Sequence, residues 1–170
     1  ERYSALGVDC VTGNATIESP YHVRVGERVI TTRNIVIATS GTPTLPPIPG
    51  LDSAEPLTSD TLWPLEERPP RLLLPGGGPT ACEMAQAFQR LGSEVTLLQR
   101  STRLLTREDP AVSTALVERF TTEGIRVLTG HRAIEFTHRD GEHRLRCAPV
   151  EAGAAEDSLT IEFDRVLVAT

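Results

Sequence analysis

The feature that most constrains this chain is a glycine-rich turn, GGGPTACE at residues 76–83, between an apolar segment and a helix-like segment. It matches the pattern GxGxxA, with Gly76, Gly78 and Ala81 in the three required places. The first glycine permits a tight turn, the second lets the backbone approach a pyrophosphate, and the small third residue allows close helix–strand packing. A helix starting at Pro79 would offer free N–H groups to phosphates. The turn therefore predicts dinucleotide binding; the alternative is an ordinary glycine turn.

The segments around this turn alternate between strand and helix patterns. Short apolar runs predict strands at residues 71–74, 94–99 and 125–128, and spacings of three and four residues predict helices at 79–91 and 110–123. The apolar stripe of the first helix is expected from Met84, Ala87, Phe88 and Leu91. Strand–helix alternation of this kind is typical of a parallel sheet with right-handed crossovers. We therefore expect an α/β, Rossmann-like domain with a parallel sheet.

A β-rich region precedes this domain. Residues 8–39 are rich in Val, Ile and Thr and are broken by turn residues, which predicts an antiparallel meander followed by a buried strand at 35–39. Residues 40–50 carry prolines at positions 43, 46, 47 and 49 and predict an extended linker. We place the domain boundary so that residues 1–53 form one part and residues 54–170 the other.

After the predicted helices the apolar period falls to two. From His131 onward the pattern predicts a hairpin around Asp140-Gly141, then a mobile loop at 151–157 and two further strands that run to Thr170. These strands form an antiparallel meander attached to the parallel sheet. Because the chain stops inside a predicted strand, we interpret it as a piece cut at both ends.

Composition narrows the function classes. The chain has 170 residues, 39% of them hydrophobic and 24% charged, which argues against disorder. A net charge of -6 argues against non-specific nucleic-acid binding, and no apolar run reaches the ~20 residues that span a bilayer. No signal peptide is recognisable, so the expected location is cytoplasmic. Cys10, Cys82 and Cys147 are too far apart in sequence for a local redox pair or a zinc motif.

The end of the second predicted strand bears on which dinucleotide is bound. An NAD site usually has an acidic residue there, whereas this chain has Gln99, followed by Arg100 and Arg103. Guanidinium groups can bind a 2′-phosphate that a carboxylate would repel. The sequence therefore favours NADP(H), with NAD(H) left open. The alternative is that both arginines are ordinary solvated surface residues.

These motifs together resemble a known family. GGGPTACEMA, followed by LGSEVTLLQR, REDPAV, GIRVL and a terminal VLVAT, is similar to the pyridine nucleotide-disulfide oxidoreductases, over essentially the whole chain. Within that family the segment LLQRSTRLLTREDPA, residues 97–111, resembles mercuric reductases more than dihydrolipoamide dehydrogenases. The resemblance implies an NADP-binding domain inserted into an FAD domain, with residues 40–50 as the crossing between them.

The resemblance also assigns cofactor positions. Glu83 corresponds to the family's glutamate that approaches the nicotinamide. The other expected NADP contacts are Gly76, Gly77, Gly78, Pro79, Thr80, Ala81, Gln99, Arg100 and Arg103. The expected FAD contacts are Gly13, Asn14, Ala15, Ala38, Thr39 and Ser40. No metal site is expected.

The implied activity belongs to a longer protein. Such an enzyme passes a hydride from NADPH to FAD, and the flavin reduces a CxxxxC disulfide whose thiols reduce the substrate, for example Hg(II). We expect that disulfide upstream of Glu1 and a dimerisation domain with the catalytic His-Glu pair downstream of Thr170, so that the full-length protein is a homodimer. This chain by itself then holds no catalytic residue and is inactive. A dihydrolipoamide dehydrogenase-like or glutathione reductase-like enzyme, or a non-catalytic nucleotide-binding module, are the alternatives.

Three positions depart from the family pattern. Ser40 replaces a glycine near the flavin nucleotide, Pro75 precedes the glycine turn, and Thr80 takes a place usually filled by an aliphatic residue. Pro75 lacks the N–H that a central strand normally donates, so we expect the loss of one ladder hydrogen bond.

Overall fold

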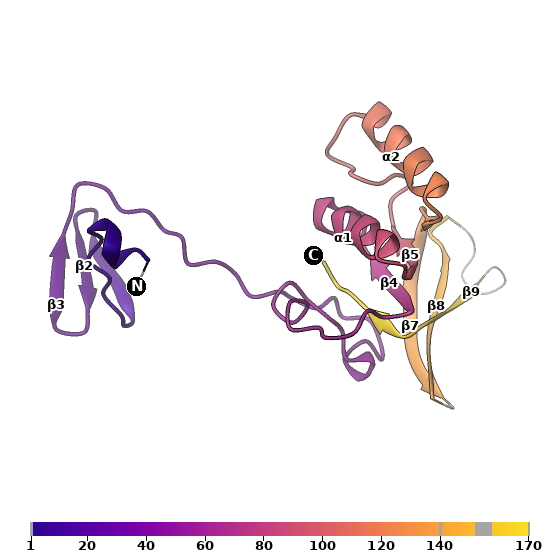
Figure 1. Cartoon of the computed structure of the whole chain (residues 1–170), viewed down its shortest axis with the longest axis horizontal. Coiled ribbons are helices and arrows are strands. Elements are labelled where there is room, and N and C mark those ends of the chain that lie inside the picture. Colours follow the sequence, from indigo (N-terminus) through magenta and orange to yellow (C-terminus); the bar gives the residue numbers. More distant parts are fainter. Residues whose placement is uncertain (1, 140, 152–157, 170) are drawn as a thin grey trace. The chain divides into compact units, whose positions relative to one another are not determined.

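The computed structural model describes residues 2–139, 141–151 and 158–169 and divides the chain into two compact units, residues 1–41 and 42–170 (Figure 1). The first unit begins with a short 3-10 turn, Ser4–Leu6. It then forms an antiparallel sheet in the order β1-β2-β3, made of β1 (Ala15–Ser19), β2 (His22–Val25) and β3 (Arg28–Thr31). The predicted N-terminal meander is therefore confirmed.

The buried strand predicted at residues 35–39 does not form. Val36 is 86% exposed and Ile37 is 70% exposed. A strand needs a neighbouring backbone to satisfy its N–H and C=O groups, and no hydrogen bond joins residues 35–39 to another strand within the described part of the chain. The apolar, β-branched composition of this segment favours a strand, but this chain supplies no sheet for it.

The second unit contains a central parallel sheet in the order β10-β4-β5-β6. Its elements are β4 (Arg71–Pro75), α1 (Pro79–Arg90), β5 (Glu94–Leu98), α2 (Pro110–Thr122), β6 (Arg126–Leu128) and β10 (Arg165–Val166). β4 pairs in parallel with β5, and β5 with β6, as the strand–helix alternation predicted. The mixed α/β, Rossmann-like fold class is confirmed. None of the helices in the described residues is long and apolar enough to cross a membrane.

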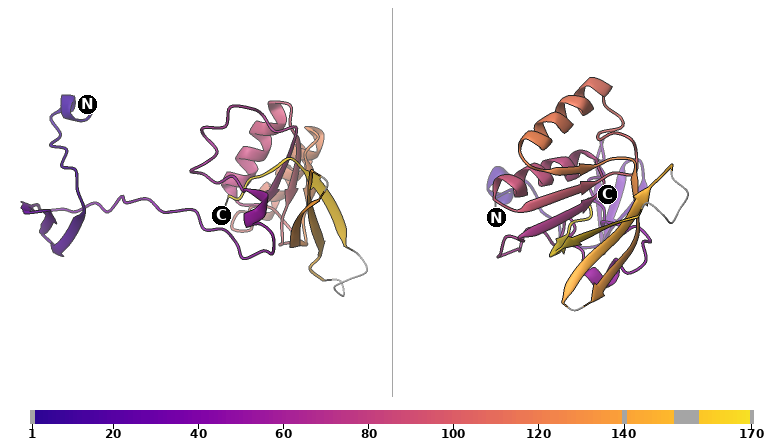
Figure 2. Two further views of the ribbon diagram at one scale, coloured as in Figure 1. Left: turned by 90° about the horizontal axis from the view of Figure 1, so that it is seen from below. Right: turned by 90° about the vertical axis from the view of Figure 1, so that its right-hand side faces the viewer.

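A second, antiparallel sheet covers one face of this parallel sheet. It is formed by β7 (His131–Arg139), β8 (Glu142–Pro149) and β9 (Leu159–Phe163), whereas α1 and α2 lie on the opposite face (Figures 1 and 2). Leu73 and Leu98 of the central sheet pack with Phe136 and Phe163 of the antiparallel sheet in one apolar core. The predicted hairpin is confirmed. Asp140 and residues 152–157 of the predicted mobile loop lie outside the described residues.

The buried face of α1 differs from the predicted stripe. Ala81, Cys82 and Ala85 are buried against the sheet, while Leu91 is 68% exposed. Spacing alone could not choose between these two overlapping faces, because Met84 and Phe88 pack at the edge of the core in either case. The alanines allow the helix backbone to approach the strands closely, which is what the glycine turn requires.

The proline-rich segment packs with the second unit. Leu51 and Ala54 are buried in the core beneath the antiparallel sheet, next to a short 3-10 turn at Asp52–Ala54. The compact units therefore divide at residues 41 and 42. The boundary at 53 and 54 between the FAD part and the nucleotide-binding part stays a prediction.

Pro75 is accommodated without loss in the ladder between β4 and β5. The N–H of Gly76 donates to the carbonyl of Leu98 at 2.7 Å, so this ladder continues past the proline. Successive backbone N–H groups point to opposite sides of a strand, and the nitrogen of Pro75 therefore faces the β10 side. On that side the amide of Leu167 donates to the carbonyl of Leu73 at 2.9 Å, but Pro75, the next residue of β4 to face this neighbour, has no N–H to donate, and the paired residues end at Val166, opposite Leu73. The expected loss of one ladder hydrogen bond therefore falls on the β10 side of β4, and the pairing of β4 with β5 is not interrupted.

A stacked histidine pair at the far end of the β7–β8 hairpin gives a testable pH dependence. His143 stacks on His138 with ring centroids 4.3 Å apart, and its Nδ1 is buried with no partner among the described residues. Burial lowers the pKa of His143, and the charges of His138 and Arg165 lower it further, against smaller opposing effects of Glu55 and Asp164. The unfolded chain therefore binds this proton more readily than the folded chain.

We expect the free energy of unfolding to be highest above pH 6.5 and to fall as the pH drops from there toward the lowered pKa of His143. A His143→Phe variant, measured by urea denaturation across this range, should lose that part of the pH dependence. His138→Phe keeps His143 buried but removes the charge of His138, so this variant should only reduce that part of the pH dependence. An unchanged pH profile in His143→Phe would contradict the assignment.

Candidate functional site

The glycine turn adopts a conformation that its three glycines fit for different reasons. Gly76 has a φ of +131°, which L side chains rarely adopt. A Cβ on Gly77 would lie 2.7 Å from Leu104 Cδ2, so this position is closed by packing. A Cβ on Gly78 would meet nothing within 4 Å, so its space opens away from the protein. The turn is therefore tight at its base and open at the start of α1.

The N-terminus of α1 is left free for a ligand. No side chain caps it, and no acidic residue lies in its first turn. The amides of Thr80 and Ala81 have no acceptor within the described part of the chain, whereas the first amide that is bonded is that of Cys82, to the Gly78 carbonyl at 3.0 Å. By contrast, Asp109 caps α2 and accepts from the amide of Ala111 at 2.8 Å. Free amides and the positive end of the helix dipole suit an anion.

A cavity of about 380 Å³ lies over this free helix end. It is enclosed by the glycine turn and by the loop that follows β5. Its lining residues are Gly77, Gly78, Pro79, Gln99, Leu105, Thr106, Arg107 and Glu108. The Leu105 amide donates to the Gly77 carbonyl at 2.8 Å, which fixes the loop against the turn. We call this space the turn cavity.

A second cavity, of about 530 Å³, adjoins the first at Gln99. It lies at the carboxyl ends of β4 and β5, where open α/β sheets bind their ligands. It is lined by Pro46, Ile48, Pro75, Gly76, Leu98, Gln99, Arg100, His131, Arg132 and Ala133. We call this space the strand-end cavity. The two cavities share Gln99 in their linings, and together they are the candidate site along the glycine turn.

The arginines predicted at this site have different environments. The half-buried Arg103 donates to the carbonyls of Glu108 at 3.1 Å and Thr106 at 2.8 Å, so its guanidinium holds the loop together. Arg100 is exposed and lines the strand-end cavity. Arg107, which the sequence interpretation missed, lines the turn cavity with an exposed side chain.

Gln99 is the polar residue common to both cavities. Its Oε1 accepts from the amide of Arg100 at 3.1 Å. Both of its backbone groups are bonded, because its amide donates to the carbonyl of Leu128 at 2.8 Å and its carbonyl accepts from the amide of His131 at 3.1 Å. It brings no negative charge to the place where a ribose 2′-phosphate would lie. Arg132, also missed from the sequence, adds a second exposed cation beside Arg100. The sequence pattern of the βαβ unit could not identify Arg132, because Arg132 belongs to β7 and not to that unit.

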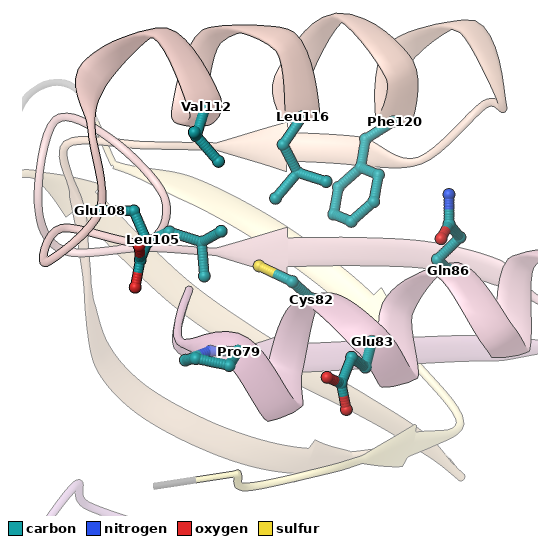
Figure 3. Close-up of a pocket in the computed structure, with 9 residues that line it drawn as sticks. All are labelled: Pro79, Cys82, Glu83, Gln86, Leu105, Glu108, Val112, Leu116 and Phe120. Carbon is teal, nitrogen blue, oxygen red and sulfur yellow. The ribbon is translucent and has the colours of Figure 1, made fainter.

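A third cavity, of about 360 Å³, lies between α1 and α2 (Figure 3). Cys82 points from α1 toward α2, whereas Glu83 points away from α2 (Figure 3). Burial raises the pKa of the Cys82 thiol to about 11, so it is not a reactive thiolate. Cys10, Cys82 and Cys147 are all free, and the described residues hold no group of three or more His, Cys, Asp or Glu side chains placed to bind a metal.

The positions expected to contact FAD belong to the first unit. Gly13 has a φ of +152°, and a Cβ there would lie 2.7 Å from Val25 Cγ1. Ser40 has a φ of +61°, a conformation that favours the glycine expected at this place. Within the described residues no hydrogen bond joins residues 13–15 to residues 38–40. The assignment of these residues to FAD stays a prediction.

Comparison with known proteins agrees with this geometry. The family described as pyridine nucleotide-disulphide oxidoreductase matches residues 2–170. A mercuric reductase of Staphylococcus aureus is 36% identical over 164 residues, which are 96% of this chain and 29% of that protein. A mercuric reductase of Bacillus cereus is 37% identical over 164 residues, 96% of this chain and 25% of that protein. The chain thus spans less than a third of the length of these relatives.

Solved structures show the same fold. The HOCl-induced flavoprotein disulfide reductase RclA from Escherichia coli has a TM-score of 0.72 and 25% identity, over 94% of this chain and 35% of that chain. The Cu(II) complex of the same reductase has a TM-score of 0.72 and 25% identity, over 95% of this chain and 35% of that chain. With its parallel sheet, its glycine turn and its free helix end, the chain belongs to the pyridine nucleotide-disulfide oxidoreductase family and is mercuric reductase-like.

Proposed function

We propose that this chain is the NADP(H)-binding segment of an FAD-dependent oxidoreductase. The observation that carries the proposal is the uncapped N-terminus of α1 beneath the turn cavity. The free amides of Thr80 and Ala81 would hold the pyrophosphate, and Gly78 leaves room for it to approach. Gln99 would face the adenosine ribose.

The cations around the two cavities favour the phosphorylated nucleotide. Arg100 and Arg107 are exposed at the cavities, and their side chains make no hydrogen bond to other described residues. A 2′-phosphate between them would receive charge-assisted hydrogen bonds. Glu108 lines the same cavity as Arg107. Its negative charge would repel a phosphate, so binding of the 2′-phosphate would depend on the arginines to offset this repulsion.

In the whole protein, the residues of the two cavities would hold NADPH, which would supply a hydride for the flavin, and Glu83 on the face of α1 away from α2 would lie near the nicotinamide. The relatives support a mercuric reductase-like parent, in which Hg(II) would be the final acceptor. The dimer, its cytoplasmic location and the alternative acceptors of a dihydrolipoamide dehydrogenase or glutathione reductase belong to the same proposal. The chain alone holds none of the later redox groups and would bind nucleotide without turnover.

Calorimetric titration of the 170-residue chain with NADPH and with NADH tests this function. We expect NADPH to bind at least about ten-fold more tightly than NADH, because each arginine–phosphate contact adds about 1.5–3 kcal/mol. The purified chain mixed with NADPH, FAD and an electron acceptor should show no turnover. Absence of any binding to either nucleotide would overturn the proposed function.

A further inference from the structure

The far end of the β7–β8 hairpin brings together two of the four histidines of the chain. His138 and His143 are paired directly across the two strands, and their imidazole rings stack with centroids 4.3 Å apart and planes inclined by 22°. Directly opposed residues leave a sheet on the same face, with Cβ atoms about 5 Å apart. The pairing of the strands therefore holds two ring donors side by side without help from a ligand.

The ring of His143 is fixed in place by its neighbours. Phe163 of β9, which is 1% exposed and is paired with His143, stacks on this ring at 5.5 Å. The Nδ1 of His143 is buried, so Nε2 is the nitrogen that a ligand can reach from solvent. His138 is exposed and can turn to share a ligand with it. One donor is thus held rigidly and the other can adapt, which lowers the cost of ordering both on binding.

The charges around the pair nearly cancel. Glu55, Asp164 and Arg165 are the charged groups that act on His143 besides the neighbouring imidazole. Arg165 pairs with Glu55 at 3.5 Å, and Asp164 accepts from Arg71 at 2.7 Å. Because each cation here has a carboxylate partner, no excess of positive charge repels a metal ion from the two rings.

The other two histidines have no such partner. The Nδ1 of His22 lies 2.8 Å from the Ser19 hydroxyl, and the Nδ1 of His131 lies 2.7 Å from the Thr129 carbonyl oxygen. Neither ring stacks on a second imidazole in the part of the chain that the structure describes. Two imidazoles that can bind one ligand therefore occur at the hairpin end alone among the described residues.

The ligand that suits two neutral imidazoles is a divalent transition-metal ion. Imidazole binds Zn(II), Cu(II) and Ni(II), whereas Mg(II) and Ca(II) prefer oxygen ligands. Structural zinc sites use four protein ligands, and no group of three His, Cys, Asp or Glu side chains is placed to bind a metal in the described residues. A site with two protein ligands leaves its other positions to water, so the ion would exchange readily.

We infer that His138 and His143 form a two-histidine site for a divalent transition-metal ion of the class of Zn(II), Cu(II) and Ni(II). The inference does not depend on the proposed function. The residues of β7 that line the strand-end cavity, His131, Arg132 and Ala133, lie at the opposite end of this strand. β7 and β8 extend from there past the parallel sheet (Figures 1 and 2). A bound ion would join the two strands at the end of the hairpin.

Calorimetric titration with Zn(II) at neutral pH tests the site. The reference protein is the 170-residue chain with Cys10→Ser, because Cys10 is a free, exposed thiol that would also bind the metal. His138→Phe and His143→Phe, each added to this reference, should weaken Zn(II) binding by about 100-fold or more, since the second imidazole binds the ion intramolecularly. His22→Phe is the matched control and should leave Zn(II) binding unchanged.

Urea denaturation gives a second measurement that does not rely on the heat of binding. Zn(II) should raise the urea midpoint of the reference and of His22→Phe, because a ligand of the folded state stabilises it, and should raise neither His138→Phe nor His143→Phe. His138 is exposed, so its variant decides the matter if His143→Phe is itself destabilised. Absence of Zn(II) binding in the reference, or a loss of less than about ten-fold in His138→Phe, would overturn the inference. NADPH affinity should be the same with and without Zn(II), so failure of the proposed function would leave this result untouched.

Discussion

Replacing Gly78 with serine should weaken NADPH binding by about 30- to 1,000-fold while leaving the free energy of unfolding unchanged or slightly higher. Gly78 has a φ of -79° and open space at its Cβ, so the backbone accepts a side chain without strain. Serine is a favoured N-cap, and its Oγ can accept from the free amides of the first turn. The same side chain occupies the approach of the pyrophosphate and takes its donors. Loss of one or two phosphate hydrogen bonds, about 2–4 kcal/mol in all, gives this range.

Two other glycines are the controls for this experiment. Gly41→Ser makes the same chemical change at a glycine with open space and no positive φ, away from the cavities, and should alter neither property. Gly77→Ser puts a Cβ 2.7 Å from Leu104 and should lower stability as well as binding. Calorimetric titration and urea denaturation of all three variants separate the effects. Unchanged NADPH affinity in Gly78→Ser would show that the turn is only structural.

Ala81 is a less informative position for the same question. From the sequence, Ala81→Leu should abolish nucleotide binding and leave most of the fold intact. Ala81 is 0% exposed and lies in the core between α1 and the sheet, so a larger side chain there overpacks the core. Such changes typically cost about 1–3 kcal/mol. A loss of binding in that variant would not distinguish the site from the fold.

The second large effect concerns the choice between NADPH and NADH. Arg107→Ala and Arg100→Ala should each weaken NADPH by about 10- to 150-fold, on the basis of about 1.5–3 kcal/mol per arginine–phosphate contact, and should change NADH affinity little. Arg103→Ala should weaken both nucleotides equally, because Arg103 donates to the carbonyls of Thr106 and Glu108 and so shapes the loop for either ligand. The preference for NADPH should also shrink as salt is raised.

The ratio of the two dissociation constants is the deciding measurement. If Arg103→Ala reduces the ratio and Arg107→Ala does not, the hydrogen bonds of Arg103 give way on binding, and the pair Arg100 and Arg103 is the correct assignment. If the wild type binds NADH as tightly as NADPH, none of the three arginines selects the cofactor.

Local sequence was sufficient for the elements that carry their own signals. The strand, glycine turn and helix from β4 to α1, the Asp109-Pro110 start of α2 and the β7–β8 hairpin are each specified by nearby residues. The strand expected at residues 35–39 was wrong because a strand depends on a neighbour that can be far away in sequence. The expected face of α1 was wrong because two stripes shared Met84 and Phe88, and only the closeness of the sheet selects the alanines.

Predicting the site from the sequence was limited in the same way. The glycines and Gln99 follow one another along a single strand–turn–helix–strand unit, so a linear pattern could find them. Ile48, Arg107 and Arg132 reach the cavities from the crossing segment, from a loop and from β7. Arg103 was expected at the phosphate because the sequence shows its charge but not the two carbonyls that hold it.

The missing cap of α1 also ties the lifetime of the folded chain to the supply of nucleotide. In α2 the side chain of Asp109 accepts a hydrogen bond from a free amide of the first turn, whereas no side chain does so in α1. A ligand that binds only the folded state raises the free energy of unfolding by RT ln(1 + [L]/Kd), which is about 2.7 kcal/mol at one hundred times Kd. On the binding proposed above, the same protein would be robust in a cell rich in reduced cofactor and vulnerable to proteases when that pool is drained.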